Sequence, residues 1–114
     1  SCALLSCYNF LENAVKSQGY KLILHGLHID LDQALARAKE RERETGRHIP
    51  PQQIKERLKM FSALWPRYLA LSEEAYLYDT NGNTPCLIAR FNCNKLEVND
   101  NISYQNFIAQ GENV

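Results

Sequence analysis

The sequence lacks a long apolar run, an excess of charge of either sign and a leader-like start. A membrane-spanning helix needs about 20 consecutive apolar residues, and no stretch of the 114-residue chain approaches that length. The first ten residues, SCALLSCYNF, have no basic opening and no long apolar core. Lys plus Arg and Asp plus Glu each number 13, so the formal net charge is zero. These features predict a cytoplasmic protein with neither nucleic acid nor a membrane as partner.

Glycine is also scarce, and none of the five glycines is followed by Lys-Ser or Lys-Thr. A phosphate-binding loop needs that ending, because its backbone amides cradle the phosphates and its hydroxyl holds magnesium. The chain alone is therefore not expected to catalyse phosphoryl transfer.

The four cysteines are separated by four and by six residues within their two pairs, which matches no zinc site built on two-residue separations. We interpret Cys2, Cys7, Cys86 and Cys93 as buried, reduced thiols that behave as small hydrophobic residues, and we predict no metal site.

Hydrophobic periodicity and turn residues predict a mixed α/β chain. Tyr20–Ile29 is an almost continuous apolar segment and is expected to be a parallel strand covered on both faces, followed by Asp30 as a helix N-cap. Pro66 is expected to kink or divide a helix over Gln53–Leu71. The other expected elements are a helix ending at Gly19, a helix from Leu31 ending at Gly46, a hairpin of Ala75–Tyr78 and Pro85–Phe91, an extended Lys95–Val98, a helix over Ile102–Ile108 and a frayed end over Gln110–Val114.

Outside the helix that ends at Gly46, the spacing of the histidines and carboxylates indicates no metal-binding or catalytic site. His25 and His28 are three apart on the predicted strand, so they face opposite sides and do not share a metal. We expect His25 to be packed and hydrogen-bonded, and Asp79 to form a turn with its own backbone. The six tyrosines are too scattered to predict a stacking platform for bases.

The stretch ALARAKERERETGRHIP concentrates the charge of the chain. Arg37 and Arg41 lie four apart on one helical face, Arg43 lies on an adjacent face, and Arg47 follows the glycine that ends the helix. One guanidinium group can bind two phosphate oxygens at once, and it stabilises charge on a transferred phosphoryl group. The alternative is a solvated helix in which Glu40, Glu42 and Glu44 neutralise the arginines.

The succession GYKLILHGLHID, ALARAKERERETGRHIP and YLYDTNG, followed by a strand, resembles the C-terminal half of the zeta-toxin family of P-loop kinases. The resemblance covers roughly residues 14–91, and its most specific piece is Arg41–Pro50. Thr80 departs from the family, which more often has asparagine directly after the aspartate of the last turn.

Members of this family use ATP and Mg²⁺ to phosphorylate the amino sugar of UDP-N-acetylglucosamine. The resemblance implies catalytic roles for Arg47 and Arg41 as arginines of a lid over the transferred phosphate, and phosphate-binding roles for Arg37, Arg43 and His48. The family's P-loop and catalytic aspartate lie upstream of the matched region. No cofactor is therefore expected to bind tightly to this chain alone.

The expected fold is thus a partial P-loop kinase-like three-layer α/β fold, with helices packed on a small, mostly parallel sheet that ends in a hairpin. Residues 1–114 are expected to form one domain, the C-terminal portion of a larger kinase domain. The alternative function is a catalytically inactive domain whose arginines bind an antitoxin-like protein or an anionic ligand. In either case a parallel strand with an open edge predicts self-association or another chain that completes the sheet.

Overall fold

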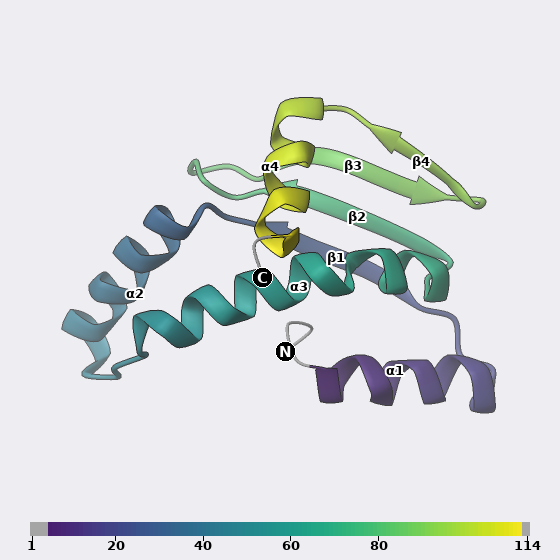
Figure 1. The fold of residues 1–114 in the computed structure, drawn as a ribbon, viewed down its shortest axis with the longest axis horizontal. Coiled ribbons are helices and arrows are strands. Elements are labelled where there is room, and N and C mark those ends of the chain that lie inside the picture. Colours follow the sequence, from purple (N-terminus) through teal and green to yellow (C-terminus); the bar gives the residue numbers. More distant parts are fainter. Residues whose placement is uncertain (1–4, 113–114) are drawn as a thin grey trace.

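The computed structural model describes residues 5–112 and shows a mixed α/β fold (Figure 1). Within these residues, four helices and four strands follow one another in the order α1(Leu5–Gln18), β1(Ile23–His28), α2(Leu31–Thr45), α3(Pro51–Leu71), β2(Glu74–Asp79), β3(Cys86–Asn92), β4(Lys95–Val98) and α4(Asn101–Glu112). The predicted order of helices and strands is confirmed.

The four strands form one open sheet in the order β1-β2-β3-β4. Strand β1 runs parallel to β2, with His25 opposite Tyr76, whereas β2–β3 and β3–β4 are antiparallel. The parallel start and the hairpin of β2 and β3 are confirmed. The expectation of a mostly parallel sheet is wrong, because two of the three described pairings are antiparallel.

Within residues 5–112, helices cover one face of this sheet and leave the other open. Figure 1 shows α3 and α4 lying across it, and α1 flanks α3, where Tyr8 meets Tyr68 edge-on at 5.3 Å between ring centroids. Along β1 the side chains alternate between exposed and buried, so Leu24 and His28 point into the core while Ile23 and Leu27 remain 52% and 59% exposed. The prediction of a strand covered on both faces is therefore wrong, and the described residues form two layers rather than three.

Helix α3 supplies four of the eleven buried hydrophobic residues in the described part, more than any other element, and is continuous through Pro66. Trp65 and Tyr68 are almost fully buried, and the ring of Trp65 packs edge-on against Phe107 of α4 at 5.6 Å. Of the two outcomes predicted for Pro66, division of the helix is wrong, because α3 runs unbroken from Pro51 to Leu71 and is held by tertiary packing around the proline. A kink at Pro66 stays a prediction. Helix α3 contacts α2 near its start, α4 along its middle and α1 near its end.

The end of the chain and the cysteines differ from expectation. Helix α4 continues to Glu112, so residues 110–112 are helical rather than frayed, while residues 113–114 lie outside the described part. Cys7 is half-buried and Cys86 and Cys93 are exposed; all three are free, as predicted, but none is buried. Cys2 lies outside the described residues. None of the helices within residues 5–112 has both the length and the apolar composition needed to cross a membrane.

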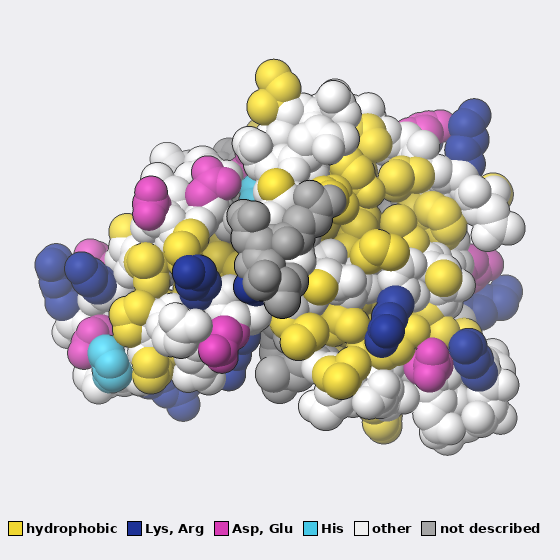
Figure 2. All heavy atoms as spheres, in the orientation of Figure 1, with side chains coloured by type: hydrophobic (Ala, Val, Ile, Leu, Met, Phe, Trp, Pro, Cys, Tyr) yellow, Lys and Arg dark blue, Asp and Glu magenta, His cyan; other side chains and the backbone are white. Residues whose placement is uncertain are grey.

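Helix α2 leaves the end of β1 and projects away from the sheet (Figure 1). None of its residues is fully buried, and the apolar face through Leu35 and Ala38 is only half-buried against α3. The helix ends where predicted, because Gly46 adopts the left-handed conformation at φ 72° and donates its N–H to the carbonyl of Glu42. Charged side chains gather over this projecting region, on the left of Figure 2.

Candidate anion-binding site on the arginine helix

The base of α2 is tied to the β2–β3 loop by Arg37. Its Nη2 donates to the carbonyl of Thr80 at 2.5 Å and lies 3.4 Å from the carbonyl of Gly82. A guanidinium that already serves backbone carbonyls has fewer donors left for a ligand. Arg37, predicted as a phosphate-binding residue, is therefore placed at the anchor of the helix.

The same loop is fastened to the junction between β1 and α2. Thr80 donates from its backbone N–H and its hydroxyl to the carbonyl of His28, at 2.9 and 3.0 Å. Asn81 accepts the backbone N–H of Asp30 at 2.9 Å, and donates its own N–H to the carboxylate of Asp79 at 2.8 Å. The turn-forming role of Asp79 is confirmed. Asp30 occupies the N-cap position, but its carboxylate makes no capping bond.

Farther along α2, acidic side chains engage two of the predicted site residues. Arg43 lies 3.8 Å from Glu40, and Nδ1 of His48 lies 3.1 Å from Glu42. These pairs are exposed, so each contributes at most about 1 kcal/mol. The neutralising role expected of the glutamates is thus observed for Glu40, at Arg43, whereas Glu42 contacts His48 rather than an arginine.

Arg41 and Arg47 are different, because neither guanidinium has an ion pair or a side-chain hydrogen bond within the described residues. Arg47 follows the left-handed Gly46, and its backbone N–H donates to the hydroxyl of Thr45 at 3.3 Å. This bond fixes the start of the turn without using the side chain. Two guanidiniums with their donors available therefore occur at the projecting end of α2.

This end of the molecule is open to solvent, since residues 39–48 are all exposed. Exposed charges attract an anion weakly and in a salt-dependent way, because the Debye length is only about 8 Å at physiological ionic strength. The arrangement can contact phosphate or carboxylate oxygens, but it surrounds no ligand by itself. Chemistry at this site requires a second surface that carries the anion.

The two histidines of β1 face opposite sides, as predicted. His28 is 2% exposed, its Nε2 lies 3.4 Å from Asp30, and its Nδ1 has no hydrogen-bond partner in the described chain. Burial lowers the pKa of His28, while the nearby carboxylates of Asp30 and Asp79 oppose this shift. His25 is exposed rather than packed in the core, and its ring stacks on Tyr76.

The stability of the chain is expected to fall as the pH drops below about 6.5, the ordinary pKa of histidine. The folded state binds the His28 proton less readily than the unfolded state, so this contribution is complete at higher pH and is lost with a slope of up to about 1.4 kcal/mol per pH unit. Urea unfolding between pH 5 and 8 measures it. His28→Gln should remove this part of the pH dependence and His25→Gln should keep it; equal curves for the wild type and His28→Gln would refute the assignment.

Two features of the structure escaped the sequence prediction. On the open face of the sheet, the rings of His25, Tyr76 and Tyr78 stack in a ladder, with centroids 5.1 Å apart for His25–Tyr76 and 6.5 Å apart for the two tyrosines. The signal was the alternation Tyr76-x-Tyr78 on one strand, which places both rings on one face. On α3, Arg57 is half-buried, and its Nε is buried without a hydrogen-bond partner.

Among the described residues, no group of three or more His, Cys, Asp or Glu side chains could hold a metal ion. Comparisons of the chain with protein-family models, with curated proteins and with solved structures gave no match.

Proposed function

We propose that the chain is a portion of a zeta-toxin-like, ATP-dependent kinase that acts on a nucleotide sugar. In this proposal Arg47 and Arg41 contact the transferred phosphate, and the chain is inactive alone. The observation that carries it is the availability of these two guanidiniums at the projecting end of α2. They belong to the segment Arg41–Pro50, which also carries the most specific part of the family resemblance.

The hydrogen bonds of α2 support a lid with an anchored base and a free end. Arg37 fastens the base to the β2–β3 loop, while residues 39–48 stay exposed. A lid needs this division, because its arginines must reach a phosphate held elsewhere without losing their orientation. The phosphate cradle, the ATP with its Mg²⁺ and the sugar would then be held mainly by the kinase portion that carries a P-loop.

The sheet supports a second part of the proposal, namely that another polypeptide segment completes it. Strand β1 has β2 on one side and no described neighbour on the other, and Ile23 and Leu27 are exposed on the face opposite the helices. Sheets built entirely of parallel strands have both faces covered, and Ile23 and Leu27 lie on the parallel pair of this mixed sheet. A strand beside β1 and a helix over this face would give the three layers of a P-loop kinase. In the isolated chain, a second copy would use the same surface.

The second candidate function is a catalytically inactive domain that binds an antitoxin-like protein or an anionic ligand. The open face favours it, because Leu27, Ile23 and the ring ladder of His25, Tyr76 and Tyr78 form an exposed apolar and aromatic surface of the kind that binds proteins. In this alternative the arginines would contact acidic groups of the partner. The two functions differ in whether Arg41 and Arg47 select phosphate.

Titration of the chain with tripolyphosphate at low ionic strength tests the proposed role of the arginines. We expect weak binding that falls steeply with added salt, and a loss of about tenfold in affinity when Arg41 and Arg47 are both changed to Gln, because each removes a charge-assisted contact. Isothermal titration calorimetry measures the affinity. Citrate, which carries the same kind of charge on carboxylates, serves as the comparison ligand.

Arg43→Gln is the matched control, since Arg43 lies on the same helix but is paired with Glu40. It should change the affinity for tripolyphosphate far less than the double substitution does. Equal effects of the control and the double variant would contradict a specific phosphate role. Tighter binding of citrate than of tripolyphosphate would favour the second function.

A further inference from the structure

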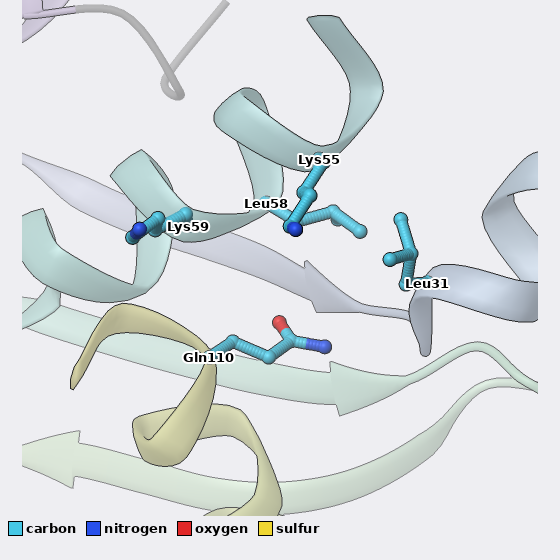
Figure 3. Close-up of a pocket in the computed structure, with 5 residues that line it drawn as sticks. All are labelled: Leu31, Lys55, Leu58, Lys59 and Gln110. Carbon is cyan, nitrogen blue, oxygen red and sulfur yellow. The ribbon is translucent and has the colours of Figure 1, made fainter. Parts of the chain in front are cut away.

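A cavity of about 150 Å³ lies between the start of α2, the first half of α3 and the end of α4. It begins at Leu31, the first residue of α2, whereas Arg41 and Arg47 lie toward and beyond the other end of that helix. The cavity shares no residue with the arginine site. Its lining residues, shown in Figure 3, are Leu31, Lys55, Leu58, Lys59 and Gln110.

The lining combines apolar side chains with a lysine whose amino group points across the cavity. Leu31 and Leu58 supply the apolar part, and Figure 3 shows Lys55 of α3 extending its amino group across the cavity toward the amide of Gln110. Lys59, one turn farther along α3, turns its amino group away from the other labelled side chains. Lys55 is therefore the charged group that faces the cavity directly, and Lys59 adds positive charge at its edge.

Neither lysine is neutralised within the described chain, where no carboxylate lies within 4.0 Å of Lys55 or Lys59. The first turn of α2 adds partial positive charge beside the cavity, because Asp30 makes no side-chain cap there. Asp30 lies instead near His28, and Asp32 in the first turn is the acidic group that opposes this field.

The cavity wall is also fixed in the absence of a ligand. Nε2 of Gln110 donates to the carbonyl of Ile29 at 3.3 Å, which joins the end of α4 to the end of β1. This bond leaves the amide oxygen of Gln110 on the cavity side, as Figure 3 shows. A preformed wall lowers the cost of ordering side chains on binding.

We propose that this cavity binds a small organic acid, with a single ring or a branched aliphatic body against Leu31 and Leu58 and a carboxylate on Lys55. An apolar cavity of about 150 Å³ is large enough for one benzene ring. A bare inorganic anion would leave the leucines without a partner, and a neutral ring would leave the amino group of Lys55 unused. One amphipathic acid would contact both the two leucines and the amino group of Lys55.

Two-dimensional ¹H–¹⁵N spectra of the chain, titrated with benzoate, test this site. Benzoate should shift the backbone amides of Leu31, Leu58 and Gln110 in a saturable way, with an affinity about tenfold higher than that of benzyl alcohol, which has the ring, or acetate, which has the charge. Lys55→Met should weaken benzoate about tenfold and leave benzyl alcohol unchanged.

Lys95→Met is the control, because it removes the same charge from β4, an exposed strand that contributes no residue to the lining of the cavity. Retained dispersion of the spectra reports that each variant is folded. Equal affinities for benzoate and either fragment, shifts that spread over other parts of the chain, or unchanged benzoate binding by Lys55→Met would each overturn the site. This experiment tests the cavity separately from the phosphate role proposed for Arg41 and Arg47, which do not line it.

Discussion

Leu27→Lys should weaken self-association of the chain about tenfold or more. Leu27 is exposed on the edge strand β1, which has β2 as its one described neighbour. Two copies that meet there would bury it, and burial of a leucine contributes about 1.5–3 kcal/mol. A lysine on this edge also disfavours the pairing of strands. Sedimentation equilibrium over a range of concentrations measures the dissociation constant.

The control for this change is Ile102→Lys on α4, where an isoleucine that is 76% exposed lies outside the sheet. This variant should associate as the wild type does. A wild-type chain that stays monomeric at every concentration, or an equal effect of Ile102→Lys, would contradict the proposal that the β1 surface receives another polypeptide.

Gly111→Val is expected to destabilise the fold by about 2–3 kcal/mol, because inserting atoms into a packed interface strains its backbone. A Cβ atom at Gly111 would lie 2.8 Å from the backbone nitrogen of Ala63 and 2.9 Å from Oγ of Ser62. Ser62 is buried and donates to the carbonyl of Phe107, so α3 and α4 cannot move apart without losing that bond. Urea unfolding followed by far-UV circular dichroism measures the loss.

Ala109→Val is the matched control, since it adds two methyl groups to an exposed position of the same helix. Its cost should be a few tenths of a kcal/mol, from helix propensity alone. Equal destabilisation by the two substitutions would mean that the close contact between α3 and α4 is not what requires glycine at residue 111.

The order of the helices and strands could be predicted because local signals mark it. Gly46 ends α2, the turn after Asp79 joins β2 to β3, and both were recognisable from residue type. Local signals could not predict which face of β1 is covered by helices. The apolar run over Tyr20–Ile29 shows which side chains favour burial, but the face that is covered depends on where α1, α3 and α4 pack, and that is set by contacts distant in sequence.

The arginines show that contacts distant in sequence also limited the prediction of the site. From spacing alone, four arginines were similarly good candidates for phosphate binding, because all of them lie on one helix or the turn after it. They are Arg37, Arg41, Arg43 and Arg47. The structure separates them through partners, of which Thr80 and Gly82 lie more than 40 positions from Arg37. Such a long-range contact leaves no mark in a single sequence. The role of Arg41 and Arg47 in phosphate binding remains a prediction.

The most direct measurement is phosphate transfer from ATP to UDP-N-acetylglucosamine by a protein in which the P-loop half of a zeta-toxin kinase precedes this chain. We predict transfer that falls about 10³-fold or more with Arg47→Ala, the range associated with arginines that contact a transferred phosphoryl group, and that stays near the unmodified rate with Arg43→Ala. An active fusion with the same turnover after Arg47→Ala and Arg41→Ala would contradict the proposal. A folded fusion that binds ATP and the sugar nucleotide but transfers no phosphate would contradict it as well.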